Sequence, residues 1–257
     1  MNKGAVVQLR ENLKALSLST MVSGLEGHLR QAKENGPGYD EFLLDLTVEE
    51  LQVRADNRLK RRVHEAKFPL IKTLEGFDFG IVPDLDIRLI RELSGCDYIK
   101  ERRNILYLGR SGTGKTHLAT ALGIEACKHN HRTRFVSCYA LVNELIEARR
   151  EKDLQRLIQR YSRYDLLILD ELGYIPFSKE GSELLFQVLA ERQEKGSVVI
   201  TTNLGFADWT QVFGDPVMTA ALLDRLTHKA HIINCQWESY RLKQSLKGIN
   251  QRHNKGE

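Results

Sequence analysis

A glycine-rich stretch near the middle of the chain has the residue types and spacing of a phosphate-binding loop. It reads GRSGTGKT at residues 109–116 and fits the pattern G-x-x-x-x-G-K-[ST]. Glycines let such a loop turn tightly and point its backbone N–H groups at phosphate oxygens, and the following helix adds the positive end of its dipole. The expected nucleotide ligands are Gly109, Arg110, Ser111, Gly112, Thr113, Gly114, Lys115, Thr116 and His117.

Two adjacent acids, Asp170 and Glu171, follow the apolar run LLIL at residues 166–169. A buried strand that ends in a carboxylate brings Asp170 to the edge of a sheet, where Asp170 and the Thr116 hydroxyl would hold Mg²⁺. Glu171 would orient and deprotonate the water that attacks the γ-phosphate. The alternative is a pair of acids that caps the next turn. Because a kinase must exclude water, a water-activating glutamate favours hydrolysis over phosphoryl transfer to a small molecule.

Two later polar residues complete the candidate catalytic set of Lys115, Glu171, Asn203 and Arg225. Asn203 ends an apolar run, so its amide could hold the attacking water, although an asparagine at a turn is a common alternative. Arg225 follows an apolar helical run and could act as an arginine finger on the nucleotide of a neighbouring subunit. From chemistry alone, a surface pair of Asp224 and Arg225 explains the sequence equally well.

From about residue 100, short apolar runs alternate with amphipathic stretches, and these elements must position the site. The expected strands are residues 105–109, 134–138, 166–170, 197–202 and 231–235. The expected helices are residues 115–130, 139–161, 182–195 and 216–226. Strand–helix alternation predicts an α/β fold with a mainly parallel sheet that is covered on both faces.

The first part of the chain is polar and predicted to be helical, with a loop at residues 34–40. Thr47 and Glu50 have the spacing of a capping box that opens a helix. Pro69 then interrupts the helical pattern. We therefore expect a small helical N-terminal domain at residues 1–67 and an ATPase domain at residues 68–257.

Composition excludes several classes of protein. The 257 residues are 42% hydrophobic and 28% charged, which is typical of a globular chain. No run of about 18 apolar residues and no secretory signal occur, so we expect no membrane association. The four cysteines are scattered without a CxxC pair, which argues against zinc and disulfide frameworks. These features predict a cytoplasmic protein.

Five blocks of sequence resemble one known family. They are GTGKTHLA at 112–119, LLILDELGYIP at 166–176, TTNLGFADWTQVFGD at 201–215, LLDRLTHKA at 222–230 and SYRLK at 239–243. These blocks are similar to the IstB/DnaC-like branch of the AAA+ ATPases. They most resemble IstB, the helper ATPase of two-gene bacterial insertion sequences.

This resemblance implies a P-loop NTPase with an AAA+ core, a five-stranded parallel sheet, ATP and Mg²⁺ as cofactors, and no C-terminal lid. It implies that Asn203 is a sensor and that Arg225 is an arginine finger acting in trans, hence a homo-oligomer. It also implies that Arg241 is a second sensor that contacts the nucleotide, and that Phe77 or Phe79 lies near the adenine.

The function implied by the resemblance is that of a transposition helper. Such a protein assembles with ATP on target DNA, and it delivers the DNA to its cognate transposase or activates that enzyme. The alternative is a DnaC-like replicative helicase loader, which shares the ATPase core but docks a helicase through its N-terminal region. A small-molecule kinase is a third reading, against which Glu171, Asn203 and Arg225 all argue.

Basic residues concentrate in residues 54–67, 139–163 and 241–257, although the formal net charge is only +4. A solvated helix face is the ordinary explanation of any single run of this kind. The second run lies where this branch of ATPases carries an extra helix that faces nucleic acid. In a multimer it would repeat into a basic track that binds double-stranded DNA largely without regard to sequence. The expected DNA contacts are Arg149, Arg150, Lys152, Arg156 and Arg160.

Overall fold

The computed structural model of the protein describes residues 3–82 and 84–239. These residues form two compact units, which divide between Arg61 and Arg62, inside a long helix. The expected Arg241 contact and the expected absence of a C-terminal lid both fall on residues outside the described range.

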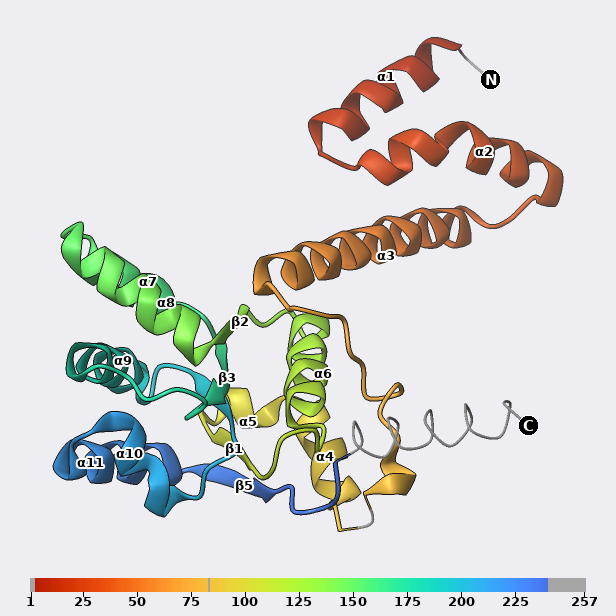
Figure 1. The fold of residues 1–257 in the computed structure, drawn as a ribbon. Coiled ribbons are helices and arrows are strands. Elements are labelled where there is room, and N and C mark those ends of the chain that lie inside the picture. The colour runs from red at the N-terminus through yellow and green to blue at the C-terminus, as the bar shows by residue number, and fades with distance from the viewer. Residues whose placement is uncertain (1–2, 83, 240–257) are drawn as a thin grey trace, which may run out of the picture. The chain divides into compact units, whose positions relative to one another are not determined.

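The N-terminal unit consists of helices only. It contains α1 (Lys3–Ala15), α2 (Ser19–Asn35) and most of α3 (Tyr39–Ala66) (Figure 1). Helix α2 ends at Asn35, and the following Gly36 has a left-handed backbone and donates its N–H to the Ala32 carbonyl. Leu25 and Leu46 are buried in this unit.

The capping box predicted at Thr47 and Glu50 is wrong, because both residues lie inside α3. The Thr47 hydroxyl donates to the carbonyls of Leu43 and Leu44 in its own helix. The Glu50 side chain, in a residue only 3% exposed, instead accepts from the backbone N–H groups of Thr20 (2.8 Å) and Met21 (3.1 Å). An acid of α3 thus satisfies the unpaired donors in the first turn of α2.

Burial by itself would raise the pKa of the Glu50 carboxyl. The hydrogen bonds from Arg54, Met21 and Thr20, together with the positive charge of Arg54, outweigh that effect and leave the pKa below its ordinary value of 4.5. Glu50 is therefore charged in the folded protein and holds α2 and α3 together.

The second unit is built on a parallel sheet. Its strands are β1 (Asn104–Leu108), β2 (Thr133–Ser137), β3 (Leu166–Leu172), β4 (Ser197–Thr202) and β5 (Ala230–Asn234). The strand order is β2-β3-β4-β1-β5, and every neighbouring pair is parallel. The sequence-based prediction of an α/β fold with a five-stranded parallel sheet is confirmed. Because all strands point the same way, the turns after β1, β3 and β4 meet at one edge.

Helices cover both faces of this sheet (Figure 1). One face carries α7 (Cys138–Arg150), α8 (Leu154–Ser162), α9 (Lys179–Arg192), α10 (Trp209–Phe213) and α11 (Pro216–Thr227). The other carries α4 (Ile87–Ser94), α5 (Asp97–Lys100) and α6 (Lys115–Lys128). Two short 3-10 helices, η1 (Phe79–Ile81) and η2 (Phe206–Asp208), lie in the connections.

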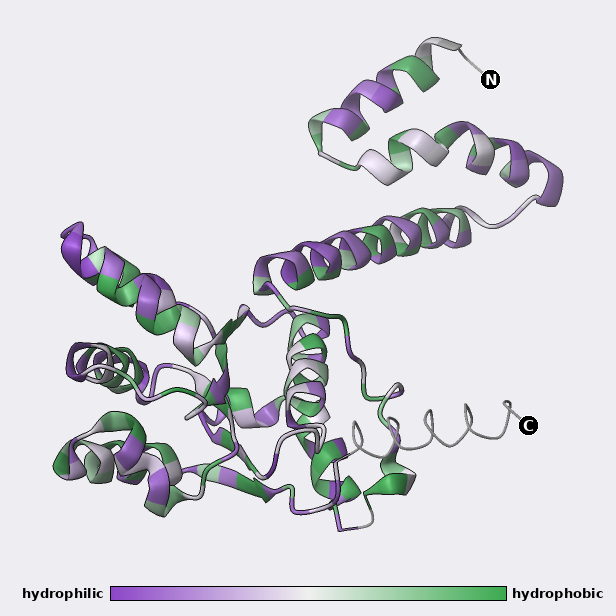
Figure 2. Cartoon of the chain, viewed as in Figure 1, coloured by the Kyte–Doolittle hydropathy of each residue, from purple (hydrophilic) through white to green (hydrophobic). Residues whose placement is uncertain are grey.

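Alternate residues of each strand feed the two hydrophobic cores. In β1, Leu106 and Leu108 pack with the helices of the first face, whereas Ile105 and Tyr107 pack with those of the second. This is the period of two that a strand buried on both faces requires. Figure 2 shows hydrophobic and hydrophilic residues interspersed along α7, as in a helix that buries one side.

The helical stretch predicted over residues 139–161 consists of two helices. Helix α7 ends at Arg150 and α8 begins at Leu154. Lys152 has a left-handed backbone (φ 60°), and the N–H of Asp153 bonds back to the carbonyl of Ala148. This turn reverses the chain, so that both helices bury apolar residues over the same face of the sheet.

Within the described residues, no helix is long and apolar enough to cross a membrane.

We expect Glu50→Ala to lower the free energy of unfolding of the N-terminal unit by about 1–3 kcal/mol, because Arg54 and two buried N–H groups lose their acceptor. Hydrogen exchange of the Thr20 and Met21 amides in the full chain measures this effect. Glu41→Ala, which changes an exposed acid of the same helix, is the matched control. Equal protection in both variants would contradict the role of Glu50.

The same interaction gives a pH dependence. Since the pKa of Glu50 is lowered on folding, its contribution to stability is present above pH 4.5 and is lost as the pH falls through the lowered pKa. Protection factors at Thr20 and Met21 should therefore decline below pH 4.5 in the wild type and stay flatter in Glu50→Gln.

Candidate functional site

The GRSGTGKT segment joins β1 to α6 and has the backbone of a tight anion-binding turn. Gly109, Gly112 and Gly114 all have positive φ angles, of 149°, 82° and 90°. A side chain at Gly109 would lie 2.1 Å from the carbonyl oxygen of Cys235, and one at Gly114 would lie 2.7 Å from the ring of Phe77. Only glycine fits these two positions, so the spacing of the motif follows from close approach as well as from turning.

The Lys115 ammonium group lies inside the loop and is close to its backbone. Its Nζ donates to the carbonyls of Gly109 (2.6 Å) and Arg110 (2.7 Å), and the residue is only 8% exposed. Lys115 is also the first residue of α6, where helix N–H groups have no partner within the helix. A cation and a helix N-terminus therefore face the same turn, which is the arrangement that favours bound phosphate.

The loop contacts the acidic end of β3 directly. The Thr116 hydroxyl donates to Asp170 Oδ1 over 2.9 Å, and Asp170 is 6% exposed. A hydroxyl and a carboxylate are hard oxygen donors of the kind that Mg²⁺ prefers, so these two residues fit the ion. Within the described residues, no group of three or more His, Cys, Asp and Glu side chains could hold a metal. A cation at Thr116 would thus share its shell with phosphate oxygens and water.

Glu171 has an unusual backbone for its residue type. Its φ is 60°, and it lies in an irregularity of β3, where Leu169 pairs with Ile200 but Leu172 pairs with Thr202. Strand β3 therefore holds one more residue than β4 here, which is a β-bulge. Because of this bulge, Glu171 lines a cavity beside the phosphate loop. The preceding Asp170 is buried and bonds to Thr116 and Thr201, which line the same cavity.

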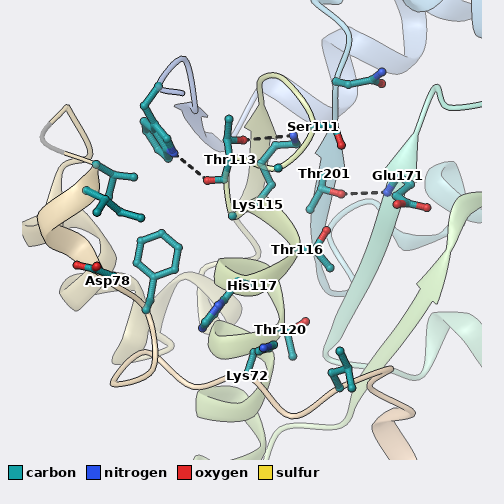
Figure 3. A pocket seen from close by; sticks show the side chains of 18 of the residues that line it. Lys72, Asp78, Ser111, Thr113, Lys115, Thr116, His117, Thr120, Glu171 and Thr201 are labelled. Atoms are coloured by element: carbon teal, nitrogen blue, oxygen red, sulfur yellow. Dashed lines mark hydrogen bonds between the residues drawn. The ribbon is translucent and has the colours of Figure 1, made fainter. Parts of the chain in front are cut away.

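The cavity has a volume of about 560 Å³ and combines the loop with a wall from the chain before β1 (Figure 3). Phe77 lines it and packs edge-on against His117, with ring centroids 5.2 Å apart. A nitrogen of His117 lies 2.8 Å from the carbonyl oxygen of Thr73. Beside the polar loop, the cavity thus offers an aromatic wall, which suits a ligand with a charged end and a flat apolar end.

Asn203 also lines this cavity, whereas Arg225 does not. The Arg225 guanidinium lies over the ring of Phe186, 4.9 Å from its centroid. Arg225 lines a small second pocket with residues at the amino ends of β1 and β4, among them Asn104 and Val198. The structure therefore places Arg225 at the opposite end of the sheet from the phosphate loop of its own chain.

Two residues that line the cavity lie outside the phosphate-loop motif and were not predicted as site residues. Trp237 is a buried residue of the hydrophobic core, and its indole N–H donates to the Thr113 carbonyl over 2.8 Å. Thr201 lies two positions before Asn203 on β4, and its hydroxyl bonds to Asp170. The period of two along a strand could have indicated Thr201, but no local pattern indicates Trp237, which joins the loop from far along the chain.

The five predicted DNA contacts are exposed on α7, α8 and the turn between them. Arg149 lies 3.6 Å from Glu180, and Arg160 forms an ion pair with Glu144. Elsewhere in the described part of the chain, no side chain forms an ion pair with Arg150, Lys152 or Arg156. The positive charge of this surface is therefore only partly neutralised.

The chain is similar to ATP-binding proteins of bacterial insertion sequences. A family model described as an IstB-like ATP binding protein matches residues 11–248. An ATP-binding protein of insertion sequence IS21 from Pseudomonas aeruginosa is 40% identical over 240 residues, which are 93% of this chain and 91% of that protein.

Solved structures with the same fold include replication proteins. The crystal structure of the DnaC helicase loader matches with a TM-score of 0.51 and 22% identity, over 57% of this chain and 86% of that chain. AMPPCP-bound DnaA from Aquifex aeolicus matches with a TM-score of 0.57 and 18% identity, over 72% of this chain and 56% of that chain. At these identities the likeness concerns the fold alone, and that fold is the expected AAA+ core.

The bond from Trp237 to the loop predicts a fluorescence signal. Trp209→Phe leaves Trp237 as the single tryptophan, and the Trp209 indole N–H has no hydrogen-bond partner to lose in the described residues. Since Trp237 bonds to the loop backbone, we expect its emission to change when ATP and Mg²⁺ are added, and to stay constant when Lys115→Ala is also present. A titration with constant emission would contradict this placement of Trp237.

Proposed function

Because the chain belongs to the IstB-like ATP-binding protein family, we propose that it is an ATP-dependent, DNA-binding helper of transposition. Family and AAA+ fold together identify an ATPase. The relative from Pseudomonas aeruginosa is named for an insertion sequence, which supports a role in the movement of such an element. In this proposal the protein assembles as a multimer on target DNA, and it delivers that DNA to the cognate transposase or activates the enzyme.

The observation that carries the proposal is the distribution of the candidate catalytic residues. Lys115, Glu171 and Asn203 line one cavity, whereas Arg225 lies at the other end of the sheet. In this arrangement the nucleotide is bound at one end of the sheet, and an arginine is available to a neighbouring subunit at the other end. The catalytic set becomes complete when the arginine of one subunit reaches the nucleotide of the next.

The chemistry proposed for the cavity is ATP hydrolysis. The loop N–H groups and Lys115 bind the phosphates, while Thr116 and Asp170 hold Mg²⁺, which neutralises phosphate charge when it is bound. Glu171 accepts a proton from the attacking water, and the Asn203 amide orients that water. Arg241, which lies outside the described residues, is proposed as a further nucleotide contact on the family resemblance.

The aromatic wall at Phe77 is the proposed site of the adenine. Phe77 lines the cavity beside the loop, while Phe79 packs behind it with ring centroids 4.9 Å apart. A flat base gains from stacking and edge contacts with such rings. Of the two phenylalanines that the resemblance implicates, Phe77 is therefore our choice.

Double-stranded DNA is the proposed partner of the α7–α8 surface. Its basic residues are exposed on two helices joined by a tight turn, and among the residues that the structure describes, acids form ion pairs there with Arg149 and Arg160 alone. Repetition of this surface in a multimer would add many phosphate contacts without base-specific ones. Residues 1–67 remain the proposed helical domain, and the reducing cytoplasm is the proposed compartment because the four cysteines are free and buried.

A DnaC-like helicase loader remains the second candidate. The fold likeness to the DnaC loader supports it, but at 22% identity that likeness concerns the fold alone. The relative with 40% identity over most of the chain is named for an insertion sequence and favours transposition.

Mixing of two inactive variants tests the action of Arg225 in trans. We expect Arg225→Ala to bind ATP without hydrolysing it, and Lys115→Ala not to bind ATP. A mixture should regain part of the wild-type turnover, because Lys115→Ala subunits supply an intact Arg225 to the ATP-loaded subunits. The control replaces the second partner by a Lys115→Ala, Arg225→Ala double variant, which should give no rescue. Equal turnover in both mixtures would exclude the trans role.

Salt dependence tests the DNA surface. We expect Arg150→Ala with Arg156→Ala to weaken binding to long duplex DNA in the presence of ATP, and to flatten the plot of log K against log salt by about 0.9 for each lost phosphate contact. Arg88→Ala with Arg91→Ala, which removes two exposed arginines from α4 on the opposite face, is the matched control. Equal binding by the two double variants would contradict the proposed surface.

A further inference from the structure

One buried hydroxyl, that of Thr201 on β4, joins both acids of the candidate site. Thr201 is 1% exposed, and its Oγ1 donates to Asp170 Oδ1 over 2.5 Å. The same oxygen accepts from the backbone N–H of Glu171 over 3.0 Å (Figure 3). A threonine hydroxyl has a single hydrogen to donate. Here the hydroxyl donates that hydrogen to the Asp170 carboxylate, while its oxygen accepts from the backbone N–H of Glu171.

The bond to Glu171 compensates for the bulge in β3. In a regular strand, consecutive side chains point to opposite faces of the sheet, so two adjacent acids could not serve one cavity. The bulge and the left-handed backbone of Glu171 change these directions. Such a conformation is unfavourable for a residue other than glycine, and the bulged residue loses its place in the strand ladder. The Thr201 oxygen gives the N–H of Glu171 an acceptor in place of a ladder carbonyl.

The bond to Asp170 fixes that carboxylate from a second side. Oδ1 of Asp170 accepts from Thr116 on the loop and from Thr201 on β4. Two donors on one oxygen restrict the rotamer of the Asp170 side chain, which would hold the metal in the proposed function. Residues that hold a metal-binding carboxylate in this way commonly change metal affinity or activity by about 10–100-fold when they are mutated.

The neighbouring threonine makes a useful comparison. Thr202 is also 1% exposed, but its hydroxyl donates to the carbonyl of Leu172 and accepts from the N–H of Leu204. Thr202 thus serves backbone groups alone, as an ordinary buried hydroxyl does. Of these two neighbouring threonines only Thr201 bonds to Asp170 and Glu171, so burial alone does not explain its place.

We propose that Thr201 is a positioning residue, whose one hydroxyl sets both the metal-binding acid Asp170 and the water-activating acid Glu171. This inference rests on the roles of Asp170 and Glu171 in the proposed function. It adds a residue of β4 that acts on hydrolysis through the two acids.

The test compares Thr201→Val, which removes the hydroxyl and keeps the shape, with Thr201→Ser, which keeps the hydroxyl. We expect Thr201→Val to lower kcat by about 10–100-fold and to raise the Mg²⁺ concentration required, with a much smaller change in the KM for ATP. Thr201→Ser should recover most of the lost kcat. Should the valine fail to fold, Thr201→Ala removes the hydroxyl without bulk at the branch point.

A readout independent of activity is hydrogen exchange at Glu171. Its amide should exchange faster in Thr201→Val than in the wild type or in Thr201→Ser, because its acceptor is gone. The control is Ser197→Ala, which removes a fully buried hydroxyl that bonds to the Tyr98 carbonyl at the other end of β4. This variant should lose stability and keep kcat.

Three outcomes with the threonine and serine variants overturn the inference. They are a wild-type kcat in Thr201→Val, a failure of Thr201→Ser to rescue, and an equal loss of kcat in Ser197→Ala. Glu171→Gln, measured in parallel, distinguishes failure of the proposed role of Glu171 from failure of the positioning role of Thr201. Normal hydrolysis by Glu171→Gln overturns the proposed role of Glu171 and this inference with it. An inactive Glu171→Gln beside a normal Thr201→Val overturns the inference alone.

Discussion

The parallel pairing of β4 between β1 and β3 is the constraint on which the candidate site depends. The phosphate loop follows β1, the two acids end β3, and Asn203 follows β4. Because all three strands point the same way, their carboxyl ends bring these segments together without any long loop. The bond from Thr116 to Asp170 and the bonds of Thr201 are consequences of this order of strands.

Local strain in the site is supported by the rigid sheet around it. Glu171 holds a left-handed backbone, and Gly109 and Gly114 approach neighbouring groups too closely for any side chain. Such conformations persist where the surroundings overdetermine them. Here the buried strands and the hydroxyl of Thr201 hold the backbone of Glu171 in place. This explains why an exposed glutamate has a conformation that glycine would adopt more readily.

The sheet also separates two functions by its two ends. Its carboxyl end carries the cavity with Lys115 and Glu171, and its amino end carries Arg225. The sheet is rigid, so a bend within one chain cannot join these ends. Because Arg225 and the cavity lie at opposite ends of the sheet, we connect hydrolysis to contact between subunits. In a multimer the basic surface of α7 and α8 would then repeat once for each subunit.

The sequence by itself determined the elements whose signals are local. Apolar runs located all five strands, and the glycine spacing located the loop, because backbone freedom and burial on both faces are written into neighbouring residues. It did not determine the turn at Lys152, the capping of α2 by Glu50, or the parts played by Thr201 and Trp237. Each of these depends on a partner distant in sequence or on how two helices share one face of the sheet. Only the tertiary structure decided them, because a hydroxyl or a carboxylate bonds to whichever unpaired donor or acceptor the fold brings within hydrogen-bonding distance of it.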